Sequence, residues 1–432
     1  MQVVPAPTRS SQGGPSGRTV PPARPGEGTR LDALDGMRGA AALGIIVLHV
    51  WMFVRGDGMR PGRDTLDVVI SQLRLGMPMF FVLSGYLIFR PFAGAALDGR
   101  RLPDLRRYAT RRVARIVPAY WVIILLTVVV LAAIGHGQRI PAEQLPVFLL
   151  FLQNYSMETA GGLNPPTWTV AVEVSFYALV PLMGLAATAG CARLGTLRAR
   201  RVLLSAACGA LIVMGTIWLG QAGFHDADRT VSHILPARMA SFAAGMLVAV
   251  LVHGRRAGRV GVVALMAAGT ALVLLEASAR GYGLGPADLR QQLVDTPASL
   301  GFACMIAAVA LGRVPGMVVF TAGPFRWAGI LSYGLYLIHF PVIYVLRTLG
   351  PWPDGLWGPV ALTLGISTVL AIVSWFALER PAIRWARRRT SPQPSPATAP
   401  GPAPDDAWPT GEARPRPVPR EREAPVAAGG GD

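Results

Sequence analysis

Stretches of mostly apolar residues recur along the chain and alternate with short polar segments. About ten of these stretches are long enough, or nearly so, to cross a lipid bilayer as a helix. They run over 39–54, 68–89, 116–134, 168–188, 202–220, 232–252, 260–277, 297–312, 328–346 and 358–378. A shorter apolar segment, 145–152, predicts a half-span or an interfacial helix. The pattern therefore predicts an all-α integral membrane protein with about ten transmembrane helices.

The polar segments differ in their arginine content, and the difference alternates along the chain. If the N-terminus is cytoplasmic, the inner segments hold the arginine clusters within 100–115, 193–201, 255–259 and 380–389, and the outer segments hold far fewer. An excess of positive residues is typical of cytoplasmic segments. The alternation predicts an even number of spans, with both termini in the cytoplasm.

The composition agrees with a membrane protein. Of the 432 residues, 52% are hydrophobic and 15% are charged, whereas soluble domains carry about 25% charged residues. The net charge is +17, from 41 basic residues, all of them arginine, and 24 acidic residues. Because these arginines lie between apolar stretches, we expect a lipid bilayer and not a nucleic acid as the partner. Cys191, Cys208 and Cys304 lack the spacing of metal ligands, so no metal site is predicted.

The two ends of the chain have a different composition. Residues 1–30 and 390–432 are rich in proline, glycine and arginine and contain few side chains that would gain from burial. Such segments do not offset the entropy that is lost on ordering. We therefore predict two disordered tails around one membrane domain, which comprises 31–389.

Arg38 and His49 lie on the first apolar segment, eleven residues apart. Eleven residues of helix make about three turns, so the two side chains share one face and lie about 16 Å apart along the axis. Ionisable residues in membrane helices are costly and usually face the interior of the bundle. The topology predicts Arg38 at the cytoplasmic mouth and His49 in the outer half.

Glu173, in the fourth span, and His339, in the ninth, are predicted to lie at a depth similar to that of His49. A carboxylate beside an imidazole fixes its tautomer and stabilises the imidazolium, which suits general-base catalysis. If these helices pack together, His49 and Glu173 form a candidate catalytic pair. The alternatives are a structural hydrogen bond for either histidine and an ion pair of Glu173 with an arginine such as Arg238.

Six sequence motifs occur in order along these spans. They are an Arg-X10-His motif, which begins within 31–42 and ends at His49, and the segments 79–87, 111–121, 168–177, 331–341 and 379–381. With these motifs the chain resembles acyltransferase family 3, whose members are integral membrane O-acyltransferases that modify carbohydrates and glycosylated natural products. It departs from the family pattern at Thr169, which replaces a serine, and at Val174, which replaces a second glutamate. No role of that second carboxylate therefore carries over.

The resemblance implies a reaction and roles for several residues. An acyl group, acetyl by family prevalence, passes from acyl-CoA to a hydroxyl, and no cofactor is permanently bound. Arg38, Arg112 and Arg115 are expected to bind the CoA phosphates, because a guanidinium group matches phosphate geometry. His49 is expected to deprotonate the acceptor hydroxyl, with Glu173 as the second catalytic residue. The predicted contacts of the acceptor are Trp168, Tyr333 and His339.

Other interpretations of the same residues stay open. Arg38 pairs with Asp35 and anchors its helix, or it binds a ligand. Ser84 and Gly85 fit close helix packing better than a nucleophile site. The competing function is a multi-span transporter or exporter of a metabolite or envelope precursor. For an acyltransferase in the plasma membrane of a bacterium, the acceptor is an envelope polysaccharide, a peptidoglycan or lipid-linked sugar, or a macrolide-type glycoside.

Overall fold

The structure is a computed structural model that describes residues 27–56, 64–135, 141–224, 229–314, 317–321 and 323–391. Most of both predicted tails lies outside these described residues, namely 1–26 and 392–432. The first helix begins at Glu27, so the last four residues assigned to the N-terminal tail are helical. The described residues contain helices and no strand, which confirms the predicted all-α fold.

Nine helical runs in the described part of the chain are long and apolar enough to cross a membrane. They are α1 (Glu27–Arg55), α2–η1–α3 (Thr65–Ser71, Gln72–Leu75, Gly76–Asp98), α4 (Leu105–Ala133), α6 (Trp168–Ala192), α7 (Leu197–Phe224), α9 (Leu235–Val252), α10 (Arg259–Gly281), α14 (Gly323–Leu349) and α15–η5–α16 (Trp357–Ser374, Trp375–Glu379, Arg380–Thr390). The predicted span 297–312 is α12 (Thr296–Leu311), which is apolar but has only 16 residues. The chain is therefore an all-α integral membrane protein, whose described residues include nine long helical runs and one shorter apolar helix.

Short helices complete the connections between these spans. They are η2 (Ala142–Gln144), α5 (Leu145–Leu149), η3 (Gln153–Tyr155), η4 (Pro165–Thr167), α8 (Arg229–Ser232), α11 (Ala287–Gln292) and α13 (Val318–Thr321). The apolar segment 145–152 forms only the five-residue helix α5. Five residues of helix rise about 7.5 Å, which is too short for the half-span considered above.

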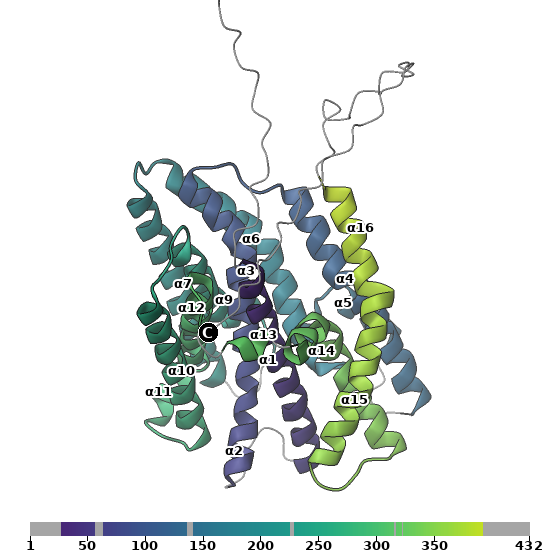
Figure 1. The fold of residues 1–432 in the computed structure, drawn as a ribbon. Coiled ribbons are helices and arrows are strands. Elements are labelled where there is room, and N and C mark those ends of the chain that lie inside the picture. The colour runs from purple at the N-terminus through teal and green to yellow at the C-terminus, as the bar shows by residue number, and fades with distance from the viewer. Residues whose placement is uncertain are drawn as a thin grey trace, which may run out of the picture. The chain divides into compact units, whose positions relative to one another are not determined.

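The long helices form two apolar clusters that meet at the centre of the bundle. Helices α1, α3 and α6 lie between α7, α9, α10 and α12 on one side and α4, α14, α15 and α16 on the other (Figure 1). One cluster includes the buried side chains of Phe92, Phe176 and Phe242, and the other includes Trp51 and Tyr120. The polar residues of the candidate site come from α1, α3, α4, α6 and α14. This arrangement of the helices gathers them where the two clusters meet.

Glycines allow α3 and α9 to approach closely. A Cβ atom added at Gly85 of α3 would overlap the carbonyl of Phe242, and one added at Gly245 of α9 would overlap the carbonyl of Val82. Small residues are the usual means by which membrane helices bring their backbones together. For Gly85, the predicted role in helix packing is therefore confirmed.

Replacement of Gly85 by alanine is expected to lower the free energy of unfolding by about 1 to 3 kcal/mol, because the new methyl group must push α3 away from α9. The matched control is Gly365→Ala on α15, where an added Cβ meets nothing within 4 Å. Thermal unfolding of the two variants in the same detergent measures the difference. Equal melting temperatures would contradict the close packing of α3 on α9.

Candidate functional site

An internal cavity of about 330 Å³ lies where α1, α3, α4, α6 and α14 meet. It brings together five of the predicted site residues. The polar residues that line it are Asp35, Arg38, Ser84, Arg112, Arg115, Thr169, Glu173, Tyr177, Ser332, Tyr333 and Tyr336. The apolar part of the wall includes Phe80, Phe81, Leu87 and Ile116. We call this space the inner cavity.

Three guanidinium groups give the inner cavity its positive charge. Arg38 donates a hydrogen bond to Asp35 at 3.2 Å, which confirms the predicted pair. Arg112 faces the rings of Tyr108 and Tyr177 at 6.0 and 5.6 Å. Its Nε is buried and has no hydrogen-bond partner among the described residues. A buried donor without a partner is costly, so Arg112 is suited to a ligand that supplies an acceptor.

Two hydroxyl donors hold Glu173 in the wall of the inner cavity. Ser84 donates to its Oε1 at 2.5 Å, and Tyr177, one helical turn further along α6, donates to the same oxygen. Neither neighbour considered for this carboxylate from the sequence, His49 or Arg238, is its hydrogen-bond partner. Arg238, considered as its ion partner, instead donates to Asp295 at 3.0 Å.

His49 pairs with the other predicted histidine and not with Glu173. Its Nδ1 lies 2.8 Å from Nε2 of His339, and the two rings are stacked with an interplanar angle of 5°. His339 is fully buried, and its Nδ1 lies 3.1 Å from the carbonyl oxygen of Leu335. Tyr336, which lines the inner cavity, has its ring centroid 5.7 Å from that of His339. The histidine pair therefore lies next to the inner cavity, one helical turn beyond Tyr336.

The relative depths that the sequence assigned to Arg38 and Glu173 are wrong, because both residues line the inner cavity. Helix α1 begins eleven residues earlier, at Glu27, so Arg38 lies well inside the helix and shares the inner cavity with Glu173. The apolar segment that was used to estimate depth begins only at 39, because the residues before it are polar. Thr167, the residue before α6, is only 1% exposed. The fourth span, which α6 forms, therefore does not begin at the surface of the protein.

Trp168 lies outside the lining of the inner cavity. Its ring contacts Phe81, which does line the cavity, and the edge of His233. The guanidinium of Arg238 lies over the Trp168 ring at 5.0 Å from its centroid. Of the predicted acceptor contacts, only Tyr333 lines the inner cavity, where its hydroxyl donates to the carbonyl of Ile116 at 2.9 Å.

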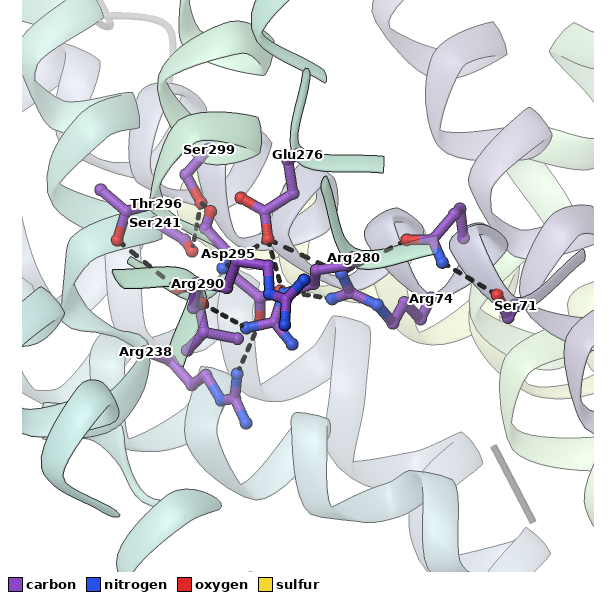
Figure 2. A network of polar contacts seen from close by, with 12 residues as sticks. Ser71, Arg74, Arg238, Ser241, Glu276, Arg280, Arg290, Asp295, Thr296 and Ser299 are labelled. Atoms are coloured by element: carbon purple, nitrogen blue, oxygen red, sulfur yellow. Dashed lines mark hydrogen bonds and ion pairs between the residues drawn. The ribbon is translucent and has the colours of Figure 1, made fainter. Parts of the chain in front are cut away.

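A network of buried ion pairs holds Arg238 in place. Figure 2 shows Arg74 and Arg238 directed at Asp295, with distances of 2.6 and 3.0 Å. Glu276 accepts from Arg280 at 3.1 Å and from the backbone N–H of Asp295 at 3.0 Å. Burial alone raises the pKa of the Asp295 carboxyl, but the surrounding guanidinium groups outweigh it and hold the pKa below its usual value. The network joins η1, α9 and α10 to the start of α12.

A second and larger cavity of about 970 Å³ lies at the end of the bundle that contains the α3–α4 and α9–α10 connections. Five arginines line it, namely Arg90, Arg100, Arg101, Arg255 and Arg256. Asp98 and His253 also line it and pair with each other at 2.7 Å. Leu87 lines both this space and the inner cavity. We call it the basic cavity.

Several residues of these cavities were missed by reasoning from the sequence. Ser84 was interpreted only as a packing residue. Of the arginines of the basic cavity, those within 100–115 and 255–259 were interpreted only as determinants of topology, and Arg90 was not considered. Tyr177 could have been found, because it lies four residues after Glu173, the spacing at which helical side chains meet. Arg90 could also have been found, since it lies within a long helical run and near its polar end.

The family model for an acyltransferase domain matches residues 31–379 of the chain. The chain belongs to the acyltransferase 3 family. Peptidoglycan O-acetyltransferase OatA of Listeria monocytogenes is 25% identical over 81% of this chain and 55% of its own length. Acyltransferase MdmB of Streptomyces mycarofaciens is 24% identical over 84% of this chain and 96% of its own length. YrhL of Bacillus subtilis is 23% identical over 81% of this chain and 54% of its own length.

The chain therefore spans about half the length of two of these curated relatives, YrhL and OatA. No solved structure matches the chain. The relatives come from bacteria, and the family and the helices together identify a bacterial membrane protein of the acyltransferase class.

Proposed function

We propose that this acyltransferase moves an acetyl group from acetyl-CoA to a hydroxyl of a carbohydrate or glycoside, in the plasma membrane of a bacterium. The observation that carries the proposal is the pair of adjoining cavities, one basic and wide, the other narrow and lined by Arg38, Arg112 and Glu173. Leu87 lies in the wall of both, so an extended ligand could occupy the two at once. An acyl-CoA has that shape, with a phosphorylated nucleotide at one end and a thioester at the other.

The sizes and charges of the cavities favour one orientation of the donor. Drug-sized ligands occupy pockets of about 300 to 1,000 Å³, so the nucleotide fits the basic cavity of about 970 Å³ better than the inner one of about 330 Å³. Arginine binds phosphate oxygens through paired donors. We therefore extend the predicted phosphate contacts to Arg255 and Arg256, while Arg38, Arg112 and Arg115 bind the part of the donor that enters the inner cavity.

The reaction then proceeds by proton transfer and acyl transfer. His49 takes the proton of the acceptor hydroxyl, and the hydroxyl oxygen attacks the carbonyl carbon of the thioester. The carbon–sulfur bond breaks, and the CoA thiolate leaves with the proton that His49 returns. The cationic wall of the inner cavity stabilises the negative charge that develops on the carbonyl oxygen. Glu173 accepts hydrogen bonds from Ser84 and Tyr177 and keeps these arginines directed into the cavity.

The acceptor is assigned to a carbohydrate because OatA is named as a peptidoglycan O-acetyltransferase. In this chain, Tyr333 is the proposed acceptor contact, since sugars stack on aromatic rings and bind hydroxyl groups. Trp168 lies outside the cavity lining and supports the wall through its contact with Phe81. His339 is close to His49 and is treated separately below. The acceptor is proposed to approach from the end of the cavity where Tyr336 and the histidine pair lie.

Membranes that contain the protein are expected to transfer label from acetyl-CoA to muropeptides and to release one free CoA for each acetyl group transferred. The measurement is labelled muropeptide by chromatography together with free thiol. Membranes without the protein are the control. Movement of muropeptides across the membrane without acetylation would contradict the proposal and favour a transporter.

The double variant Arg255→Gln, Arg256→Gln is expected to raise the KM for acetyl-CoA about tenfold or more and to change kcat little. The reason is that both arginines lie in the basic cavity, away from the reacting atoms. The double variant Arg193→Gln, Arg198→Gln, at two exposed arginines near the α6–α7 connection, is the matched control for the loss of two positive charges. An equal rise in KM in the control would show that only the general surface charge matters.

A further inference from the structure

The hydrogen bonds around His339 allow only one placement of its proton. A carbonyl oxygen accepts and does not donate, so the contact of 3.1 Å between His339 Nδ1 and the Leu335 oxygen requires a proton on Nδ1. In a neutral imidazole the other nitrogen, Nε2, then carries a lone pair and acts as an acceptor. His339 is fully buried within α14, so the neutral form is the one that the surroundings favour.

The proton on His49 follows from the same reasoning. Nδ1 of His49 lies 2.8 Å from Nε2 of His339, and this nitrogen of His339 can only accept. His49 must therefore donate from Nδ1, which leaves its own Nε2 without a proton. The rings are stacked almost parallel and Phe340 packs edge-on against both, so neither ring can turn over without breaking these contacts.

We infer that His339 is a positioning residue that fixes His49 in the Nδ1-protonated tautomer and leaves Nε2 of His49 as the basic nitrogen. Two hydrogen bonds in series, from His339 to the Leu335 carbonyl and from His49 to His339, set this tautomer. In other proteins, a group that binds one ring nitrogen of a catalytic or metal-binding histidine fixes its tautomer in the same way. The inference deepens the proposed function, because it rests on His49 acting as the base. It assigns His339 to orient His49, in place of the predicted contact with the acceptor.

The test uses the full-length protein in lipid nanodiscs, labelled with ¹⁵N in its histidines. The chain has 6 histidines, so the signals of His49 and His339 can be assigned from the variants that lack each one. In the unaltered protein, Nδ1 of His49 is expected to give the shift of a protonated nitrogen and Nε2 that of an unprotonated one. In His339→Leu, where the acceptor is lost, His49 is expected to lose this fixed tautomer.

Two further variants separate positioning from packing. Glutamine in place of His339 can present an amide oxygen near the former Nε2, so His339→Gln is expected to keep the tautomer of His49 and to lose less than about tenfold in kcat. His339→Leu is expected to lose about 100-fold in kcat with little change in KM. Phe340→Leu removes the ring that packs on both histidines but keeps their hydrogen bond, and it is expected to keep the tautomer.

The outcomes for the inference and for the proposed function are distinct. A protonated Nε2 on His49 in the unaltered protein, or an unchanged tautomer in His339→Leu, would overturn the inference whatever the activity. If both histidines show the expected tautomers but the protein transfers no acetyl group, the inference stands and the proposed function fails. Equal loss of kcat in the glutamine and leucine variants would also overturn the inference.

Discussion

Asparagine in place of His49 is expected to lower kcat for acetyl transfer about 10⁴-fold while the protein stays folded. Asparagine can place its amide nitrogen near the position of Nδ1, so the hydrogen bond to His339, 2.8 Å long in the structure, can be kept. It has no counterpart of Nε2, so the base that takes the acceptor proton is lost. The variant therefore removes the chemistry with little change in packing.

The measurement is a single-turnover assay with acetyl-CoA and muropeptides, together with the equilibrium binding of CoA. Binding of CoA is expected to change less than about threefold, because His49 does not line the basic cavity. A variant that retains full transfer activity would show that His49 is not the base.

Glu173→Gln distinguishes the two predicted catalytic residues from each other. The amide keeps the shape of the side chain but removes the negative charge among Arg38, Arg112 and Arg115. If Glu173 mainly positions these arginines, the loss should appear in KM for acetyl-CoA as well as in kcat. If His49→Asn changes only kcat, the two residues have different roles even though the sequence predicted them as one pair.

The spans could be predicted from the sequence because a helix in lipid needs a continuous run of apolar residues. The same requirement explains why the eighth predicted span, 297–312, was placed correctly. It corresponds to α12, although that helix has only 16 residues. The Arg38–Asp35 pair could be predicted for a similar reason, since spacing within one helix fixes it. Such features depend on local sequence, and no information on packing is needed to find them.

The partners of His49 and Glu173 could not be predicted in this way. His339 is 290 residues from His49, and the contact depends on which faces of α1 and α14 meet. Depth along a helix, counted from the edge of an apolar segment, put His49 level with Glu173. The count failed because the two helices do not enter the bundle at the edges of their apolar segments: α1 continues back to Glu27, and Thr167 before α6 is already buried.

Asparagine in place of Asp295 is expected to lower the free energy of unfolding by about 3 to 5 kcal/mol, more than Gly85→Ala does. Asp295 accepts from both Arg74 and Arg238 (Figure 2). Its side chain is only 10% exposed. An amide cannot balance two buried guanidinium groups, and neither arginine can give up its charge at ordinary pH. Asp295 also has φ = +60°, a conformation that asparagine tolerates, so the backbone is not the cause of the loss.

The matched control is Asp32→Asn, which breaks an exposed pair with Arg326, whose side chain is 52% exposed. Exposed pairs contribute about 0 to 1 kcal/mol, so thermal unfolding in detergent should separate the two variants clearly. The Asp295 variant should also lose acetyl transfer at temperatures where it remains folded, because Arg238 is released from its place over Trp168. Equal stability of the two variants would mean that water or lipid headgroups reach the network and screen its charges, and that α9, α10 and α12 are held together by apolar packing alone.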